Sequence, residues 1–467
     1  MAYFKRHNIL FLLVFTGFIA LYVLNPYELN FQDFEKILKS GIKKQINSSV
    51  PVTFYHNAYL DLRFNPPRLR LFSLNSCLEN NQYLLVKLYY KFKTEPVFIK
   101  LYGEPLEGNC PSSYGPASSC FYTAHTFFAD LTLTEGLRKV VVDLGVRRQI
   151  ELNVEIINKP NEKGLTVCRL PVYYYSQWQS ILLFIEAWRA HGATRFIIFY
   201  HSATKDTRKV LHYYQNLGII ELRPWPSFGN LPSNIAYNNP KLDESVFIFS
   251  YFLAMNICIL DIKTTIGTIA DFDEIMVPLD GTVLDYALKE TMGTNIGALS
   301  FENQYVAMKP SISSSDFSGL SSPIFLDKAG PAKYIFNVSS LDVAQVHWPR
   351  RFIDSSKTTK IADGALLHYR YNIENEGTIP VDKSFRFFPS NSSKHIQNMH
   401  ETATKIFNGS VPEFSSKSIN AFNECVRRID ELGIMCRSIG GICKEKLDEV
   451  DHWVYDKTEG VFLSGAN

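Results

Sequence analysis

The sequence predicts an α/β protein with a β-rich unit ahead of the α/β part and a membrane helix at the N-terminus. Three observations lead to this prediction: an apolar run opens the chain, short strand-like segments follow it to about residue 165, and helical and strand-like segments alternate after Cys168. With 467 residues, 46% of them hydrophobic, the chain can build more than one large core. The net charge of +2, with no long basic run, argues against a nucleic-acid partner.

The N-terminal segment is expected to be a retained membrane anchor. Residues 8–24 are almost entirely apolar, and Lys5 and Arg6 precede them. The run is shorter than the roughly 20 residues that cross a bilayer, but the thinner membranes of the secretory pathway lower that demand. No small-residue cleavage site follows, which disfavours a cleaved signal peptide. We expect residues 1–7 to be a cytoplasmic tail, 8–24 the transmembrane signal anchor and 25–50 a stem.

Sequons and cysteines suggest that the body of the chain lies in a lumenal, oxidising compartment. Four Asn-x-Ser/Thr sequons follow the apolar run, at Asn47, Asn337, Asn391 and Asn408. All eight cysteines follow it too, and their even number favours disulfides, with buried free thiols as the alternative. Local spacing suggests Cys110 with Cys120, and one bridge among the last three, Cys425, Cys436 and Cys443.

Residues 51–165 are predicted to form a β-rich domain, pictured as a small antiparallel sandwich. Strand-like runs at 83–90, 97–102, 139–144 and 151–156 are separated by glycine, proline and asparagine clusters. The polar segment 158–164 is predicted to link this domain to the next one.

Residues 166–385 are predicted to form an α/β domain. The expected order is helix 181–188 ended by Gly192, strand 195–200, helix 205–217, strand 219–225, helix 242–260 and strand 266–271. Such alternation predicts a largely parallel sheet, in which ligands bind at the carboxyl ends of the strands. Residues 386–467 are expected to be a C-terminal extension that carries three cysteines.

Three carboxylates, Asp271, Asp273 and Glu274, follow the last of these strands. In an extended segment Asp271 and Asp273 share one face, while Glu274 lies on the other and braces the turn. Two neighbouring carboxylates repel each other unless a cation joins them, and Mn²⁺ or Mg²⁺ prefers oxygen ligands together with substrate phosphates. The segment therefore predicts a metal site at Asp271 and Asp273, with a solvated acidic surface as the alternative.

The same segment, Asp271-Phe-Asp-Glu-Ile-Met-Val-Pro278, resembles the Asp-x-Asp-Glu-Phe-hydrophobic-Val-Pro signature of glycosyltransferase family 92. Further segments resemble motifs of that family in the same order: 171–175, 185–200, 223–226, 256–258, 333–336, His347 and 365–370. The resemblance spans roughly residues 165–372. It implies a GT-A fold and a type II Golgi membrane protein that transfers a hexose, typically galactose, from a UDP-sugar to a glycan acceptor, with inversion and with Mn²⁺.

The resemblance also implies a nucleoside site after the first α/β strand. Its residues would be Tyr200, His201, Ser202 and Asp206, with an ordinary helix-capping loop as the alternative. His201 stands where the family carries Asn or Asp, and Ile257 stands where it carries Asp. These departures motivate a different function class, a non-catalytic, membrane-tethered glycan-binding protein on the same fold.

Two histidines and one glutamate complete the predicted site. His347 or His368 is expected to supply a third metal ligand, with a hydrogen-bonded core histidine as the alternative. Inversion needs a general base near the acceptor hydroxyl, and Glu302, on a probable strand after the acidic segment, is the candidate. Asp316 and Asp363 compete with it.

Overall fold

The computed structural model describes residues 28–29, 32–33, 35–36, 53–76, 83–110, 112, 114–145, 148–225, 241–307, 316–321, 323–370, 378, 385–390, 392–413, 416–434, 436–458 and 463–464. The predicted tail 1–7, the anchor 8–24 and most of the stem 25–50 lie outside these residues, as do Asn47, Asn391 and Cys77. No helix in the described ranges is long and apolar enough to cross a membrane.

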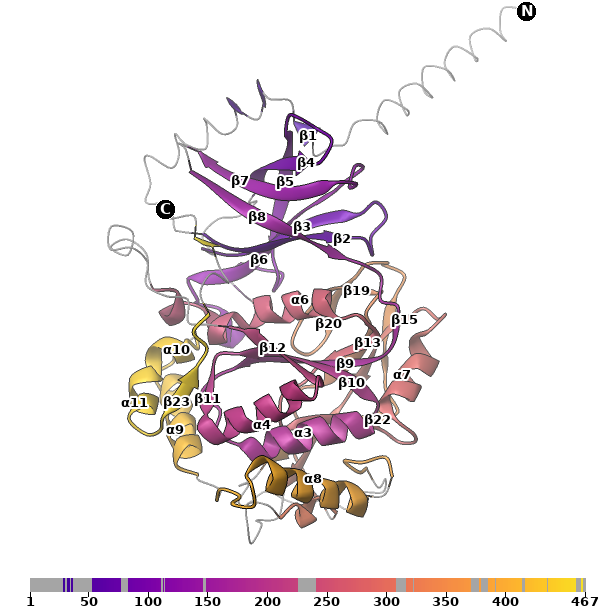
Figure 1. Ribbon diagram of the computed structural model, residues 1–467, viewed down its shortest axis with the longest axis vertical. Helices are drawn as coiled ribbons and strands as arrows, with labels where there is room; N and C mark the ends of the chain where they lie inside the picture. The colour runs from indigo at the N-terminus through magenta and orange to yellow at the C-terminus, as the bar shows by residue number, and fades with distance from the viewer. Residues whose placement is uncertain are drawn as a thin grey trace, which may run out of the picture.

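The N-terminal unit is a β-sheet that closes on itself (Figure 1). Its strands are β1 (Glu28–Leu29), β2 (Phe54–Asp61), β3 (Arg68–Ser76), β4 (Tyr83–Tyr90), β5 (Val97–Pro105), β6 (Tyr122–Asp130), β7 (Leu137–Gly145) and β8 (Arg148–Ile157), with β24 (Leu463–Ser464) added to β2. The order β5-β4-β7-β8-β2-β3-β6 returns to β5 through a β5–β6 pairing. The β-rich prediction is confirmed, but the antiparallel sandwich is wrong, because β5 pairs with β6 to close a single sheet and β2 pairs with β8 in parallel.

Alternating apolar side chains explain this closed sheet. Val86 and Leu88 on β4, Ile99 and Leu101 on β5, and Val140 on β7 are fully buried and belong to one cluster. In a strand, alternate residues point to the same side, so each strand contributes one apolar row to the interior.

The second unit is α/β. Its main elements are β9 (Glu162–Val172), α3 (Trp178–Ala190), β10 (Ala193–Tyr200), β11 (Ser202–Thr204), α4 (Lys205–Asn216), β12 (Ile220–Pro224), α6 (Tyr251–Asp261), β13 (Thr264–Ile269), α7 (Val283–Thr291), β15 (Ile296–Phe301), β18 (Lys333–Asn337) and β21 (Thr358–Ile361). The sheet order is β12-β10-β9-β13-β18-β15-β21. Neighbouring strands are parallel except at β18, which is antiparallel to β13 and to β15. The predicted alternation and the largely parallel sheet are confirmed.

A second, smaller sheet and a hairpin flank the main sheet. The sheet has the order β14 (Glu274–Pro278), β22 (Gly364–Arg370), β16 (Asn303–Ala307) and β17 (Ile324–Phe325), and the hairpin joins β19 (Leu341–Ala344) to β20 (Pro349–Phe352). The chain thus leaves the main sheet after β13 and enters the smaller sheet at β14, which requires a sharp change of direction between Ile269 and Glu274.

The predicted helix 242–260 is wrong in its first half. Short 3₁₀ turns occupy Leu242–Glu244 and Phe247–Ser250, and α6 begins only at Tyr251. Ile248, Phe249 and Ser250 have positive φ angles of 33°, 49° and 61°. Left-handed conformations of this kind cost L-residues about 1–3 kcal/mol each, so the surrounding structure must impose them.

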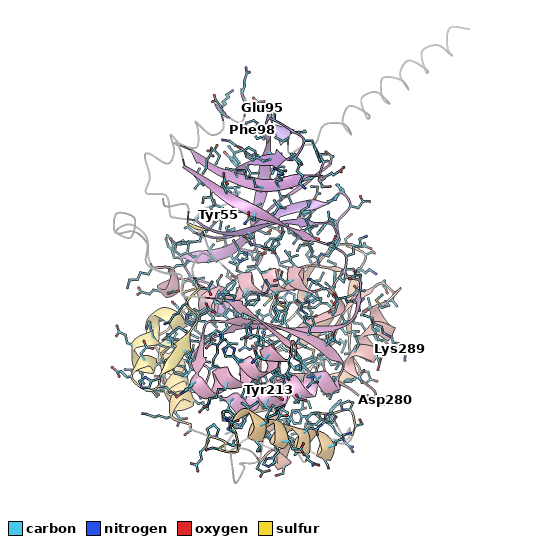
Figure 2. The ribbon with its side chains drawn as sticks, in the orientation of Figure 1. Tyr55, Glu95, Phe98, Tyr213, Asp280 and Lys289 are labelled. Atoms are coloured by element: carbon cyan, nitrogen blue, oxygen red, sulfur yellow. A yellow bond between two sulfur atoms is a disulfide. The ribbon has the colours of Figure 1, made fainter. Side chains whose placement is uncertain are left out.

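Helices cover both faces of the main sheet, and the two units share one core. In Figure 1, α3 and α4 lie on one face, while α6 lies on the other face, toward the closed sheet. α6 packs against β3 and β6, and apolar residues from both units join one buried cluster. Buried ion pairs cross the same boundary, as when the guanidinium of Arg70 bonds to Asp342. Figure 2 shows side chains filling both units and the space between them.

The C-terminal residues pack against the α/β unit as α8 (Ser392–Ile406), α9 (Lys417–Glu431), α10 (Ile439–Ile442), α11 (Lys444–Asp448) and β23 (Trp453–Tyr455). The described disulfides are Cys120–Cys436, Cys168–Cys258 and Cys425–Cys443. The bridge among the last three cysteines is confirmed. The Cys110–Cys120 pairing is wrong, because Cys120 bonds instead to Cys436, 316 positions away, and so ties the closed sheet to the C-terminal helices.

Candidate functional site

The carboxylates that follow β13 lie in a tight turn. The Glu274 amide donates to the Asp271 carbonyl at 3.0 Å, and the Glu274 carboxylate accepts from the Asp271 amide at 2.9 Å. The predicted extended segment, with Glu274 on the opposite face, is therefore wrong, because the chain must turn here to reach β14. The bracing role expected of Glu274 is confirmed.

Neighbouring aromatic residues pack against this turn and form hydrogen bonds with its backbone. Phe272 is buried, with its ring centre 5.2 Å from that of Phe184. Tyr369 donates two hydrogen bonds to the turn: its hydroxyl to the Phe272 carbonyl, and its backbone amide to the Asp273 carbonyl at 3.0 Å. The Trp188 indole donates a third, to the Glu274 carbonyl at 3.2 Å. The backbone of the turn is thus bonded at successive positions, which fixes the direction of the carboxylates.

Two cations from neighbouring strands meet the Asp271 carboxylate. Arg169 of β9 lies 3.0 Å from one oxygen, and the ammonium of Lys333, at the start of β18, lies 3.2 Å from the other. Although burial acts in the opposite direction, the charges of Lys333 and Arg169 hold the pKa of Asp271 well below its usual range. Asp271 is therefore an ionised group between two cations.

Lys333 also forms an ion pair with Glu274. Its ammonium lies 3.2 Å from the Glu274 carboxylate, and both side chains are almost inaccessible to solvent. Burial raises the pKa of Glu274, and the negative charge of Asp271 acts in the same direction, while Lys333 opposes both effects. The buried ammonium is thus the group that keeps two adjacent carboxylates compatible.

Asp273 faces His368 rather than these cations. The His368 Nε2 lies 3.2 Å from Asp273 Oδ2, and the Asn303 amide lies 3.1 Å from His368 Nδ1. With Asn303 donating to Nδ1, the Nε2 proton points toward Asp273. The Tyr305 ring stacks on the imidazole with ring centres 4.7 Å apart. Residues nearly a hundred positions apart are thus brought together by the β14–β22 pairing, in which Glu274 is opposite His368.

His347 lies near this group without joining it. Its Nδ1 donates to the Ala332 carbonyl at 3.0 Å, and burial and then the charge of Lys333 lower its pKa, while Asp271 opposes the shift. In the ranges that the structure describes, no three His, Cys, Asp or Glu side chains converge as metal ligands. Of the four predicted metal ligands, the structure brings Asp273 and His368 into direct contact, places Asp271 two residues away on the same turn, and leaves His347 bonded elsewhere.

The donor types nonetheless fit a divalent cation. A carboxylate oxygen and an imidazole nitrogen lie within 3.2 Å of each other, and 26% of the Asp273 side chain is exposed to solvent. To bind a metal through Nε2, the imidazole would have to carry its proton on Nδ1 instead, where the Asn303 side-chain amide, turned to present its oxygen, would accept it. Water and phosphate oxygens can supply the remaining ligands of Mn²⁺ or Mg²⁺.

The sequence reasoning missed two residues of this site, Arg169 and Lys333. A signal existed for both, since Arg169 interrupts the buried run of β9 and Lys333 directly precedes the apolar Tyr334-Ile-Phe336 of β18. Burial, and then the charge of Asp271, raise the pKa of Tyr251, the first residue of α6, while Lys333 and Arg169 oppose the shift.

The predicted nucleoside residues lie largely under the C-terminal strand. β23 pairs with β11, and the Tyr200 hydroxyl donates to the Val454 carbonyl at 2.5 Å. His201 is 2% exposed, bonds to the Ser202 hydroxyl at 2.8 Å and packs on Phe249. Asp206 lies apart from them, in the first turn of α4, with Lys209 3.5 Å away. As placed, Tyr200, His201 and Ser202 contact protein rather than solvent.

Burial of His201 predicts a pH-dependent stability. Burial, then the nearby Lys444, lowers its pKa from 6.5 to about 3. Because the unfolded state takes up the proton first, the contribution of His201 is present above pH 6.5 and is lost as the pH falls, by about 1.4 kcal/mol per pH unit. We expect His201→Gln to flatten the fall in unfolding free energy between pH 6.5 and 4 by that slope, measured by urea denaturation. The exposed His212→Gln is the control, and an equal pH dependence in both variants would contradict the assignment.

Glu302 follows β15 at the same edge of the sheet. Phe301, the last residue of β15, is opposite Lys333 in the β15–β18 pairing, and the Glu302 carbonyl accepts from the Leu366 amide at 2.8 Å. Its side chain is exposed. Asp363 is also exposed but follows β21 and lies in the turn before β22, and Asp316 bonds the Ser318 amide at 2.8 Å.

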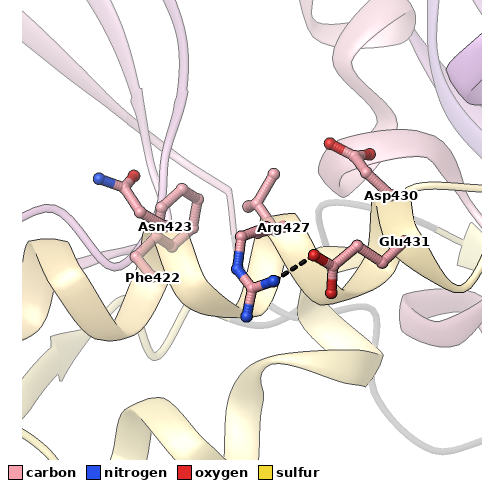
Figure 3. Close-up of a pocket in the computed structure, with 6 residues that line it drawn as sticks. Phe422, Asn423, Arg427, Asp430 and Glu431 are labelled. Atoms are coloured by element: carbon pink, nitrogen blue, oxygen red, sulfur yellow. Dashed lines mark hydrogen bonds and ion pairs between the residues drawn. The ribbon is translucent and has the colours of Figure 1, made fainter.

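A shallow groove runs along one side of α9 (Figure 3). It is lined by Phe422, Asn423, Val426, Arg427, Asp430 and Glu431. Arg427 is bonded to Glu431 and, at 2.8 Å, to Glu424 within the same helix. The groove contains none of the residues of the acidic turn.

Comparison with known proteins adds a family. A family model described as glycosyltransferase family 92 matches residues 163–407, just over half of the chain. No curated protein matches it by sequence. Similar solved structures include glucosyl-3-phosphoglycerate synthase from Mycobacterium tuberculosis with Mn²⁺, UDP-glucose and phosphoglyceric acid, at 12% identity and a TM-score of 0.25, covering 54% of this chain and 81% of that one. The same enzyme with Mg²⁺ and UDP is 10% identical, with a TM-score of 0.24 and coverages of 54% and 80%.

Proposed function

The chain belongs to glycosyltransferase family 92, and from this premise we propose that it transfers galactose from UDP-galactose to a glycan acceptor, with inversion and with bound Mn²⁺ or Mg²⁺. A nucleotide-sugar glycosyltransferase is the function that the family supports. The sugar, the metal and the stereochemistry are our proposal, as are a GT-A type fold and a Golgi membrane location with the catalytic unit in the lumen.

The observation that carries the proposal is the charge arrangement at the carboxyl end of β13. Carboxylates from one turn meet Arg169 and Lys333 from the two neighbouring strands, at the edge where α/β sheets bind ligands. Alternating charges of this kind suit a donor that brings a diphosphate and a metal ion together. A solvated acidic surface would not place a buried lysine between two carboxylates.

Asp273 and His368 would hold the metal ion, with Asp271 beside them. When bound, a divalent cation supplies Lewis-acid stabilisation to the diphosphate leaving group. Asn303 and Tyr305 hold the His368 imidazole in place, while Arg169 and Lys333 keep Asp271 ionised. These two cations also add positive charge where the leaving group gains negative charge.

We assign the general base to Glu302. The acceptor oxygen forms a bond to the anomeric carbon as the bond from that carbon to the diphosphate oxygen breaks, so one displacement inverts the centre. The acceptor proton passes to the Glu302 carboxylate, and UDP leaves with the electron pair of the broken bond. The exposure of Glu302 at the same sheet edge supports this assignment.

The non-catalytic alternative loses its main motivation. Ile257 is 2% exposed within α6, and His201 is buried against Phe249. Both departures from the family pattern therefore lie in the core, and neither removes a charge from the acidic turn.

The decisive experiment is an assay of the full, detergent-solubilised chain with a panel of UDP-sugars and glycan acceptors. We expect the fastest transfer from UDP-galactose with Mn²⁺, an inverted anomeric configuration by NMR, and loss of at least about a hundredfold in rate with excess chelator. Chelator-insensitive transfer would overturn the metal assignment. Glycan binding without turnover of any UDP-sugar would favour the non-catalytic alternative.

A further inference from the structure

The turn of the β19–β20 hairpin, residues 345–348, carries an exposed tryptophan. Trp348 is 54% exposed, whereas the other four tryptophans of the chain, all of them in the described ranges, are buried or only partly exposed: Trp178, Trp188, Trp225 and Trp453. A single exposed apolar side chain is ordinary on a protein surface, so its surroundings must decide what it means.

The hairpin turn is fixed at both of its ends. The Gln345 amide donates to the Trp348 carbonyl at 3.1 Å, which closes the turn. Just before it, the side chain of Asn256 on α6 donates to the Ala344 carbonyl at 3.2 Å and accepts from the Ala344 amide at 3.0 Å. Just after it, Arg350 donates to two backbone carbonyls at the end of β5, at 2.7 Å each. The indole of Trp348 therefore projects from a well-anchored support (Figure 1).

The hairpin turn lies against the segment that carries Lys333. His347 Nδ1 donates to the Ala332 carbonyl at 3.0 Å, and the Tyr334 hydroxyl donates to the Gln345 carbonyl at 2.9 Å. The ammonium of the residue between them, Lys333, lies 3.2 Å from a carboxylate of the acidic turn. The hairpin turn is thus bonded on both sides of the lysine that pairs with the candidate site.

The same segment also contacts the partners of His368. A Cβ on Gly330 would lie 2.9 Å from the side chains of Asn303 and Tyr305, so the backbone of this glycine packs closely on both. Asn303 bonds the His368 imidazole, and Tyr305 stacks on it. Residues 330–333 therefore join the candidate metal ligands on one side to the hairpin turn on the other.

The proposed general base lies at the end of the same segment. In the β15–β18 pairing Phe301 is opposite Lys333, so Glu302 and Ala332 are the residues that extend past this pair, one on each strand. Ala332 is the residue to which His347 bonds. An acceptor whose hydroxyl reaches Glu302 therefore has the rest of its sugar within reach of the hairpin turn.

We propose that Trp348 is the acceptor platform, the aromatic face on which a pyranose ring of the acceptor glycan stacks. The face of an aromatic ring carries partial negative charge, which attracts the weakly positive C–H bonds on the apolar face of a pyranose. The ligand class is a pyranose with several ring C–H bonds on one face, as in β-galactopyranosides. The platform rests on the proposed function, because it concerns the acceptor of the same reaction.

Sugar binding in the absence of donor tests the platform directly. The probe is methyl β-galactoside, titrated into the full, detergent-solubilised chain while tryptophan fluorescence is recorded. We expect a saturable shift of the emission to shorter wavelength, because the exposed indole leaves water, and no shift in Trp348→Ala. Trp453→Phe is the matched control: Trp453 is partly exposed but donates to the Leu447 carbonyl at 2.9 Å, and its removal should leave the shift intact.

A second sugar tests the chemistry of the contact. Methyl α-mannoside carries an axial methoxy group that interrupts the C–H face, so it should bind at least about tenfold more weakly than methyl β-galactoside. Equal binding of the two sugars, or a shift that persists in Trp348→Ala, would overturn the platform.

Acceptor kinetics provide an independent test. Because Trp348 is exposed, Trp348→Ala should fold normally and raise the KM for the acceptor by roughly tenfold, with the KM for the UDP-sugar nearly unchanged. Trp348→Phe keeps an aromatic face and should recover most of this loss, whereas Trp348→Leu keeps apolar bulk alone and should not. Equal recovery by Phe and Leu, or an equal rise in both KM values, would contradict stacking of the acceptor.

The outcomes separate the platform from the function. A chain that transfers sugar with an unchanged acceptor KM in Trp348→Ala would overturn the platform and leave the proposed function in place. A chain that binds methyl β-galactoside through Trp348, yet transfers sugar from no UDP-sugar, would overturn the proposed function and leave the platform as the glycan site of the non-catalytic alternative.

Discussion

Asp273→Ala is expected to abolish sugar transfer while leaving the fold intact. Asp273 faces His368 at 3.2 Å, and its carboxylate, unlike that of Glu274, is not buried beside Lys333. Losing a ligand of the leaving-group metal should remove several kcal/mol of transition-state stabilisation, or about a thousandfold in kcat/KM. The measurement is transfer from UDP-galactose across a Mn²⁺ titration, beside a thermal melt.

Asp280→Ala is the matched control for this variant. Asp280 is an exposed aspartate a few residues further along, labelled at the edge of the molecule in Figure 2. Its removal should leave both transfer and melting temperature unchanged. Transfer by Asp273→Ala within about tenfold of the native rate would contradict the role of Asp273, because a metal ligand contributes more than that.

Much of the fold could be predicted because its signals are local. The apolar face of α3, the strands β4, β5, β7 and β8 of the closed sheet, and the alternation after Cys168 follow from periodicity alone. Closure of the sheet through β5 and β6, and the Cys120–Cys436 bridge, could not be predicted, because both join segments that no local pattern relates. The break in the predicted helix before α6 could not be predicted for a different reason. Tertiary contacts impose a positive φ on Ile248, a conformation that the residue itself disfavours.

The candidate site likewise has a part that the sequence predicts and a part that it does not. Asp271 and Asp273 can be proposed from the sequence, because carboxylates after an apolar strand are conspicuous there. The partners of Asp271 cannot be predicted in this way, since Arg169 and Lys333 reach it only through the pairing of β9 and β18 with β13. The predicted face of Glu274 is wrong because side chains alternate between faces only within a strand, and the chain turns at Asp271, before β14 begins. Its place in an apolar strand makes His368 a candidate metal ligand in the sequence. That Asp273 is its partner follows only from the β14–β22 register.

The Lys333 ammonium is expected to contribute strongly to stability. Its side chain is 3% exposed and lies 3.2 Å from both Asp271 and Glu274. Lys333→Met keeps most of the apolar volume but leaves the buried Glu274 without this cation, a loss that typically costs about 3–5 kcal/mol. Asp271 retains Arg169 at 3.0 Å, so the deficit should come mainly from Glu274. Urea denaturation at pH 7.5 measures it.

Three comparisons make this assignment specific. Lys360→Met removes an exposed lysine from Glu290 and should cost at most about 1 kcal/mol, the usual range of a surface pair. Adding Glu274→Gln to Lys333→Met should recover part of the loss, because no buried charge is then left unpaired. Burial raises the pKa of Glu274, and removing Lys333 takes away the charge that opposes this shift, so the deficit of Lys333→Met should shrink as the pH falls toward 4.5. A deficit that persists in the double variant and does not change with pH would instead mean that Lys333 stabilises the fold by packing alone.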